Sequence, residues 1–379
     1  MKIRILTFHC AKNYGAVTQA YALKTVLKRY TDDVAFINYR PLFITNRAML
    51  EKPNNPSIKY FIIETIRKIV GVIRYHFWGY KEKIQKYVLF EKEYLLDPNQ
   101  PSFTKKEQIN AEGTNYIFLG SDQIWNNKIT FEDTAFFGDF SKGPNAKLIS
   151  YAASIGLDDP GEDTSLFISK NINSIDKISV RESSAEKFIA ALTSKRIENV
   201  LDPTLLLDTQ EWSKLAVLPQ YNKYLLFYNM GNRELAECVA KEVAKIKGLE
   251  IVEISSGGKS IRKVYSHQYL GNVGPREFIG VIQNADFVVT SSFHGTAFSL
   301  IFNKQFYAIP NPPVTSRMED LLSKISIENR LISSLEELAK RDISKDPIDY
   351  SEVNKSLELE RQKSINFIEN SLGVNNGDE

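Results

Sequence analysis

Short apolar runs alternate with helical patterns at the start of the chain. Residues 2–8 form an apolar-rich run that predicts a strand, and residues 16–29 repeat apolar side chains with the period of a helix. Residues 34–38 predict a second strand. This strand–helix–strand order is typical of a parallel sheet that is covered by helices, so the sequence predicts an α/β fold.

Further along the first half, four more apolar runs each end in polar residues. They lie at 116–119, 147–151, 177–180 and 199–201. Ligands of open parallel sheets bind at the carboxyl ends of the strands. We therefore expect a functional site near these four strand ends.

A second α/β pattern begins at 224–228, after a polar stretch near 212–222 that contains Pro219. The tail at 351–372 has the pattern of a charged helix. The runs between them predict strands at 250–254, 286–290 and 305–309 and helices at 234–247, 275–284 and 296–302.

These patterns predict two Rossmann-like domains that face a cleft, with the ligand between them. The first domain is expected to span residues 1–215 and the second to span residues 222–340. Residues 345–379 are expected to form a C-terminal helix and tail, and the helix can cross back to the first domain.

Residues from about 56 to 96 interrupt the first domain with an amphipathic pattern. Between 58 and 96 an apolar stripe repeats every three or four residues, and eight basic residues stand against four acidic ones. The pattern predicts one or two helices that pack on the sheet as an insertion. The alternative is a basic face that rests on an anionic membrane surface.

Composition and charge exclude several classes of protein. The 379 residues, of which 43% are hydrophobic and 25% charged, are typical of a two-domain globular protein. A formal net charge of +2 gives no reason to expect a nucleic-acid partner. Cys10 and Cys238 lie far apart and the four histidines are scattered, so we predict neither a disulfide framework nor a bound metal.

The sequence also argues against membrane insertion and secretion. The uncharged stretch at 287–303 has 17 residues and many polar side chains, which is unlike a spanning helix. The apolar stretch after Lys2 and Arg4 is too short for a signal peptide. We expect a soluble, cytoplasmic protein.

Three positions carry side chains that suit a ligand of this fold. Asn13–Gly15 lies between a strand and a helix, where free backbone N–H groups favour an anion, although Gly15 alone can explain the turn. Arg181 directly follows a strand, and its guanidinium group suits a carboxylate or phosphate unless it is structural. His294 stands at a helix start, where an imidazole can act as acid or base or simply cap the helix.

Two nucleotide-binding signatures are absent. Gly258–Ser260 reads Gly-Lys-Ser, but a P-loop needs a glycine five residues before Gly258, and that position is Glu253. No G-x-G-x-x-G occurs either, so we predict no nicotinamide or flavin cofactor.

Six short motifs occur in order at the predicted strand ends and helix starts. They are Asn13–Gly15, Gly120–Asn126, Tyr151–Gly156, Ser179–Glu182, Leu201–Thr204 and Ser291–Thr296. With this set the chain resembles the polysaccharide pyruvyl transferase family from about residue 1 to 335. The segment at 41–100 and the tail after 340 carry none of the motifs.

The resemblance implies a glycosyltransferase-B-like architecture, with the acceptor on the N-terminal domain and the donor on the C-terminal domain. Characterised members of the family transfer the enolpyruvyl carbons of phosphoenolpyruvate onto two hydroxyls of a sugar and form a cyclic pyruvate ketal. Neither a redox cofactor nor an obligatory metal is implied. The acceptor is expected to be a sugar or lipid-linked oligosaccharide precursor of a capsule or exopolysaccharide, made at the cytoplasmic face of the membrane.

The resemblance also implies roles for single residues. Arg181 and His294 match positions that hold phosphoenolpyruvate, and we expect His294 and Asp122 to exchange protons with the substrates. Some members have an arginine two residues before the histidine, where this chain has Ser292, so Arg317 or Lys259 must supply the missing cation. The full set of expected binding residues is Arg181, Asn13, Tyr14, Gly15, Ser121, Ser292, Gly295, Thr296, Lys259 and Arg317.

Two other functions remain open at this point. A nucleotide-sugar glycosyltransferase could use the same fold, with the loop at 255–259 holding a diphosphate. A non-catalytic glycan-assembly component is the other, and its support is Ser292 in place of arginine. The sequence does not specify the oligomeric state.

Overall fold

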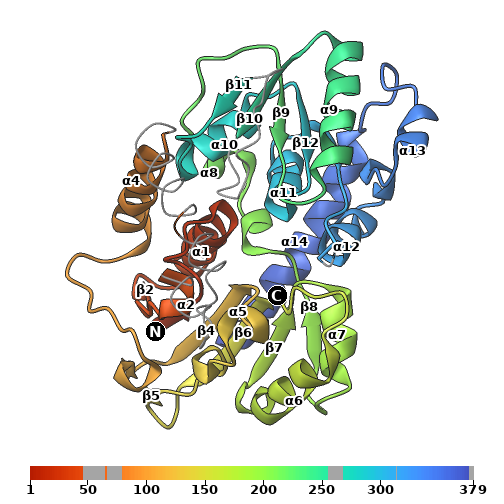
Figure 1. The fold of residues 1–379 in the computed structure, drawn as a ribbon. Helices are drawn as coiled ribbons and strands as arrows, with labels where there is room; N and C mark the ends of the chain where they lie inside the picture. The colour runs from red at the N-terminus through yellow and green to blue at the C-terminus, as the bar shows by residue number, and fades with distance from the viewer. Residues whose placement is uncertain (46–64, 66–78, 255–267, 313, 375–379) are drawn as a thin grey trace, which may run out of the picture.

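The fold is seen in a computed structural model that describes residues 1–45, 65, 79–254, 268–312 and 314–374. Two parallel sheets organise the chain into two lobes. In Figure 1 the N-terminal sheet lies in the lower lobe and the C-terminal sheet in the upper lobe. The predicted α/β fold is therefore confirmed.

The first sheet, as far as the structure describes it, has six strands in the order β2-β1-β4-β6-β7-β8. Every adjacent pair is parallel. Helices cover both faces of such a sheet, which explains why its central strands are nearly continuous apolar runs. The bounds are β1 Ile3–Leu6, β2 Val34–Phe36, β4 Tyr116–Asp122, β6 Lys147–Ala153, β7 Lys177–Val180 and β8 Ile197–Asn199.

The second sheet has the order β11-β10-β9-β12-β13 within the described ranges, and its adjacent pairs are again parallel. A separate two-stranded ribbon, β3 with β5, flanks the first sheet. The bounds are β3 Asn110–Ala111, β5 Ser141–Lys142, β9 Tyr224–Tyr228, β10 Glu250–Ile254, β11 Gln268–Leu270, β12 Phe287–Thr290 and β13 Gln305–Ala308.

Helices connect the strands and cover the sheets (Figure 1). In the first lobe they are α1 Tyr14–Leu27, α2 Leu42–Thr45, α4 Tyr80–Phe90, α5 Asn127–Thr130, α6 Gly161–Asn171 and α7 Ser183–Ala190, and α8 Thr209–Ser213 leads into the second lobe beside α10. In the second they are α9 Arg233–Lys247, α10 Pro275–Gln283, α11 Phe293–Ile301, α12 Ser316–Lys324, α13 Leu335–Ala339 and α14 Tyr350–Leu372. Short 3₁₀ or π turns are η2 Glu91–Leu95, η3 Lys106–Gln108, η4 Thr134–Phe137, η5 Ile172–Ser174, η6 Pro203–Leu206 and η7 Glu328–Arg330.

One apolar core joins the two lobes around helix α1. Val17 and Leu23 of this helix pack in the same cluster as Phe278 of α10 and Phe298 of α11. The ring of Tyr14 stacks on that of Phe278, with centroids 4.3 Å apart and planes 5° apart. Because the shared core is large and apolar, it fixes how the two sheets face each other.

Helix α14 crosses from the second lobe back to the first (Figure 1). The Ser364 hydroxyl accepts a 2.9 Å hydrogen bond from the backbone N–H of Leu201. The Tyr116 hydroxyl donates to the carbonyl of Leu372 over 2.9 Å. These contacts confirm the predicted crossover helix and hold it beside the chain that leads into Asp202.

Helix α4 is the described part of the predicted insertion, and it contacts both lobes. Glu91, just after α4, forms ion pairs with Arg40 and Lys12 of the first lobe. Lys86 pairs with Glu277 of α10 in the second lobe at 2.8 Å. Most of the predicted stripe and its basic residues fall at 46–64 and 66–78, outside the described residues.

The two lobes, the helical insertion and the crossover helix together form a glycosyltransferase-B-like α/β architecture, as the resemblance implied. No helix among the described residues combines the length and the apolar character needed to cross a membrane.

Candidate active site

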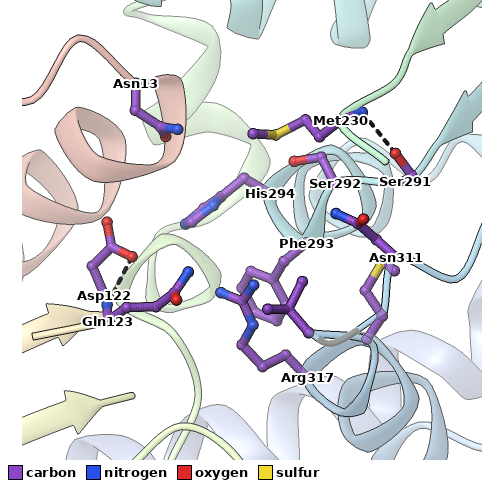
Figure 2. Close-up of a pocket in the computed structure, with 12 residues that line it drawn as sticks. Asn13, Asp122, Gln123, Met230, Ser291, Ser292, Phe293, His294, Asn311 and Arg317 are labelled. Carbon is purple, nitrogen blue, oxygen red and sulfur yellow. Dashed lines mark hydrogen bonds between the residues drawn. The ribbon is translucent and has the colours of Figure 1, made fainter. Parts of the chain in front are cut away.

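A cavity of about 230 Å³ lies between the two lobes at the carboxyl ends of their strands. Figure 2 shows Asn13, Asp122 and Gln123 of the first lobe on one side, with His294 and Arg317 of the second lobe projecting toward them. Residues of both lobes therefore line a single cavity. The remaining lining residues are Met230, Ser291, Ser292, Phe293, Asn311, Val314 and Met318.

Two helices begin at this cavity, one from each lobe. The side chain of Asn13 caps α1 by accepting a hydrogen bond from the N–H of Ala16 at 3.2 Å. Ser292 caps α11 in the same way, from the N–H of Gly295 at 3.4 Å. Because the N-terminal end of a helix carries a partial positive charge, both helices favour an anion in the cavity.

Arg181 and Asp202 form a buried ion pair beneath the cavity. The Nη1 atom of Arg181 lies 2.8 Å from Oδ2 of Asp202, and both side chains are almost wholly withdrawn from solvent. The Nε and Nη2 atoms of Arg181 are buried without a hydrogen-bond partner in the described structure. The guanidinium plane also lies over the ring of Phe293, 4.7 Å from its centroid. Two N–H-bearing nitrogens of Arg181 thus have no acceptor in the described structure, and guanidinium donors of this kind suit an anionic ligand.

Glu182 places a second buried carboxylate beside this arginine. Its Oε1 atom accepts hydrogen bonds from the hydroxyl of Ser154 and from the N–H groups of Ile155 and Gly156. Its Oε2 atom lies 3.7 Å from Nε of Arg181. Burial acts to lower the pKa of Arg181, but the charges of Asp202 and Glu182 outweigh it and raise that pKa.

His294 lies at the start of α11 and is enclosed by the opposite lobe. Its Nε2 atom faces Oδ2 of Asp202 at 3.7 Å. Nε2 is buried and makes no hydrogen bond in the described structure. The other side of the ring lies against Gly15 of α1, where an added Cβ would come within 2.0 Å of Nδ1. Only 8% of the residue is exposed, because groups of both lobes pack around it.

Arg317 is the second cation of the cavity and comes from α12. Burial, together with the positive charge of Arg181, lowers the pKa of Arg317 to about 10. The group still carries its proton at neutral pH, and its buried Nε makes no hydrogen bond in the described structure. Two guanidinium groups near one cavity repel each other, and an anion between them would relieve that repulsion.

Asp122 ends strand β4 at the edge of the cavity. Its backbone has a φ of 72°, which few non-glycine residues adopt. Its Oδ1 atom accepts a 2.8 Å hydrogen bond from the N–H of Gln123, drawn as a dashed line in Figure 2. Asp122 is one of the residues that line the cavity.

Other residues expected at the site lie behind the lining. The Tyr14 hydroxyl donates to the carbonyl of Val273 over 2.8 Å. The Ser121 hydroxyl is buried and donates to the carbonyl of Ala152 and to Asp202. Thr296 is buried within α11, and Gly295 packs against Thr290. Lys259 lies outside the described residues, as does the rest of the loop at 255–267.

Several residues of the site were not among the predicted ones. They are Asp202 beneath the cavity and the lining residues Gln123, Met230, Ser291, Phe293, Asn311, Val314 and Met318. Asp202 lies in one of the recurring motifs at a strand end, and this position was the signal that could have identified it. Gln123 directly follows Asp122 in another motif. Met230 and Asn311 line the cavity from loops of the second lobe, where no local pattern marks them.

The described residues include no group of three or more His, Cys, Asp or Glu side chains arranged to hold a metal ion. The cavity instead gathers arginine, histidine, aspartate and two helix starts. Such a set can bind a dianion or trianion and exchange protons with it.

Comparison with solved structures gives similarities at low sequence identity. S. aureus MnaA in complex with UDP has a TM-score of 0.49 and 11% identity, covering 100% of this chain and 99% of that chain. UDP-N-acetylglucosamine 2-epimerase from Rickettsia bellii has a TM-score of 0.47 and 9% identity, covering 99% and 98%. Arabidopsis thaliana UGT89C1 complexed with quercetin has a TM-score of 0.46 and 12% identity, covering 98% and 99%.

A search of curated proteins finds no match to this chain. A family profile does match, over residues 13–313, and its description is polysaccharide pyruvyl transferase. The match includes the motifs that place Asn13, Asp122 and His294 on the interlobe cavity and Arg181 and Asp202 beneath it. The chain belongs to the polysaccharide pyruvyl transferase family.

Proposed function

We propose that this protein transfers the enolpyruvyl group of phosphoenolpyruvate onto two hydroxyls of a sugar and forms a cyclic pyruvate ketal. Family membership supports the proposal. The observation that carries it is that His294 and Arg317 line one cavity with Asp122 of the other lobe, while the buried Arg181 lies beneath it. These are the groups that a substrate with both a phosphate and a carboxylate requires.

The donor fits the charge of the cavity. Phosphoenolpyruvate carries two anionic groups close together, and Arg181 and Arg317 offer buried N–H donors without partners in the described structure. The starts of α1 and α11 add backbone dipoles. Arg317 takes the place of the arginine that some family members have at the position of Ser292, while Ser292 here caps α11.

The chemistry needs two proton-exchanging groups. His294 donates a proton to the methylene carbon C3, which makes C2 electrophilic. The first hydroxyl adds to C2 and loses its proton to Asp122, and the bond from C2 to the phosphate oxygen then breaks. The second hydroxyl adds to C2 and closes the ring. Of the two protons that the hydroxyls lose, one replaces the proton given to C3 and the other leaves with the phosphate. No further cofactor enters this sequence.

The acceptor is proposed to be a sugar of a lipid-linked oligosaccharide, a precursor of a capsule or exopolysaccharide, bound on the first lobe near Asp122. We propose that the enzyme works at the cytoplasmic face of the membrane. In the described part of the basic segment, Lys86 pairs with Glu277 and Lys83 is buried against the ring of Tyr14. The proposed membrane contact would therefore be made by the other basic residues of 58–96. Flotation with anionic vesicles tests it.

The competing nucleotide-sugar function would place a diphosphate in the loop at 255–259, which lies outside the described residues. A second place for a diphosphate, the start of α9, has less support, because it would need free backbone donors in the turn after β9. The N–H groups of Met230 and Gly231 already donate to the hydroxyl of Ser291, at 2.7 and 3.0 Å. Arg233 in the same turn forms a bidentate pair with Glu253.

Calorimetric titration with phosphoenolpyruvate, followed by phosphate-release assays with a panel of glycan acceptors, tests the proposal. We expect binding that weakens at least about tenfold in Arg181→Ala and in His294→Ala. Arg196→Ala is the matched control, because the Arg196 side chain is 85% exposed. Stabilisation by nucleoside diphosphates and not by phosphoenolpyruvate would favour the glycosyltransferase. A His294→Ala protein that keeps full biological activity would favour a non-catalytic component.

A further inference from the structure

We infer that Asp202 is the positioning residue of this site and that it orients His294 and Arg181 across the boundary between the two lobes. The inference rests on the proposed function, because it assigns a proton-exchanging role to His294. It adds a residue that does not line the cavity and would not touch substrate.

Hydrogen bonds that involve neither His294 nor Arg181 hold Asp202 in place. Its Oδ1 atom accepts hydrogen bonds from the N–H and the hydroxyl of Thr204, at 3.0 and 2.7 Å, and so caps η6. The N–H of Leu201, directly before it, donates to Ser364 of the crossover helix. With one oxygen fixed in this way, the other has a defined direction.

That second oxygen, Oδ2, is shared by groups from both lobes. From the first lobe it accepts hydrogen bonds from Nη1 of Arg181 at 2.8 Å and from the hydroxyl of Ser121 at 3.3 Å. From the second lobe it faces Nε2 of His294 at 3.7 Å, just beyond a hydrogen bond. Nε2 makes no hydrogen bond in the described structure. A shift of the lobes by a few tenths of an ångström would complete this bond.

The carboxylate is charged at any working pH. Burial alone would raise the pKa of Asp202, but the adjacent His294 and Arg181 hold it far below its ordinary value. A fixed negative charge beside an imidazole sets its tautomer and stabilises the imidazolium form. With Nε2 directed at Asp202, Nδ1, which lies on the side of Gly15, is the ring nitrogen left to exchange a proton with substrate.

The charges of the other groups around His294 show why Asp202 is needed to stabilise the protonated imidazole. Arg181 and Arg317 are positive, and α1 presents the uncharged Asn13 and Gly15 to the ring. Asp122 lies across the cavity. Within the part of the chain that the structure describes, Asp202 is the carboxylate recorded within 4 Å of the imidazole. Without it, the imidazole would lack the nearby negative charge that stabilises its protonated form.

Further contacts across the lobe boundary hold this arrangement together. Ser183 donates a hydrogen bond to Asp320, and Lys324 donates to Asn199. The N–H of Ser316 in α12 donates to Asp158 of the first lobe at 3.1 Å. Together with the shared apolar core, these contacts fix the distance between His294 and Asp202.

The experiment compares Asp202→Asn, Asp202→Glu and Thr204→Val with wild type. For Asp202→Asn we expect kcat to fall by about 100-fold and the alkaline limb of the kcat profile, where the proton donor is lost, to move to lower pH by about one unit. Asp202→Glu should regain part of kcat. Thr204→Val keeps the charge but frees Oδ1, so kcat should fall several-fold with an unchanged pH profile; this variant tests the inference if Asp202→Asn fails to fold. Asp208→Asn, which alters an exposed helix cap, is the control.

A second measurement does not depend on turnover. With only four histidines in the chain, ¹⁵N-labelled imidazole signals can be assigned by substitution, and their chemical shifts report which ring nitrogen of His294 carries a proton in the substrate-free protein. We expect the balance of His294 tautomers to change in Asp202→Asn. Identical ¹⁵N shifts of His294 and identical pH profiles of kcat in wild type and Asp202→Asn would overturn the inference. A wild type that never releases phosphate from phosphoenolpyruvate would instead refute the proposed function, and the ¹⁵N shifts would still decide the role of Asp202.

Discussion

Gly15 of the first lobe packs directly against the imidazole of His294 in the second. A Cβ at position 15 would lie 2.0 Å from Nδ1 and 2.3 Å from Cε1 of that ring. Contacts this short do not occur between real atoms, and the backbone of α1 is held by the Tyr14–Phe278 stack. The imidazole must therefore move if the glycine is replaced.

The first prediction follows from this contact. Gly15→Ala should displace His294 and lower kcat by at least about tenfold, since small misplacements of a reacting group are costly. The substitution lies in a helix, so the fold should persist and be visible as a cooperative thermal transition. Gly143→Ala is the control, because a Cβ there meets its nearest atom at 3.5 Å. Equal activity of the two variants would show that His294 can shift without loss.

Arg317 should contribute to donor binding rather than to the chemical step. We expect Arg317→Gln to raise KM for phosphoenolpyruvate by about 10- to 100-fold, because an N–H donor and a positive charge are both lost. The change in kcat should be smaller. Arg317→Lys should recover the charge but not the planar donor set, and so only part of the affinity. An unchanged KM in Arg317→Gln would transfer the role of second cation to a group outside the described residues, with Lys259 the first to test.

Asp158 connects the first lobe to the helix that carries Arg317. Its carboxylate accepts hydrogen bonds from the N–H groups of Thr315 and Ser316, at 3.4 and 3.1 Å, and so caps α12 from the opposite lobe. Asp158→Ala should release the start of α12, raise KM for phosphoenolpyruvate several-fold and leave kcat at saturation nearly unchanged. The neighbouring exposed Asp159 provides the matched control, Asp159→Ala. A fall in kcat with KM unchanged would contradict this role.

The central elements of the fold follow well from local sequence patterns, because the central strands of both sheets bury apolar runs of their own. The predicted helix at 16–29 is observed as Tyr14–Leu27, two residues earlier, since the side chain of Asn13 caps it. The ribbon formed by β3 and β5 was not predicted, because its strands are only two residues long and have no apolar run. Strand β11 was missed as well, and it follows the loop at 255–267.

The candidate site was predictable only in part. Arg181 and His294 could be identified because strand ends and helix starts are marked in the sequence. The contact of Asp202 with His294 and that of Asp158 with α12 join residues that lie far apart in the chain. They depend on how the lobes dock, and periodicity carries no information about docking. Likewise, the charge of Lys86 suggested a membrane face, yet its partner is Glu277 of the other lobe.

The last prediction concerns acid stability and a histidine away from the cavity. His9 is fully buried after β1, where Nδ1 lies 3.1 Å from the carbonyl of Thr7 and Nε2 lies 3.2 Å from Oδ1 of Asn38. Burial lowers the pKa of His9 to about 4, the positive charges of Arg40 and Lys12 add to this, and the two hydrogen-bond acceptors oppose it.

The sign of the effect follows from proton binding. In the unfolded chain His9 binds a proton below its ordinary pKa of about 6.5, whereas in the folded protein it remains neutral down to a pKa of about 4. Unfolding therefore takes up a proton between these values, and stability is lost as pH falls from 6.5 to 4, by about 3 kcal/mol in total. Urea unfolding at pH 7.5 and 4.5 should show a smaller loss in His9→Gln than in wild type. If wild type instead gains stability relative to His9→Gln at low pH, the two acceptors outweigh burial and His9 is charged in the fold.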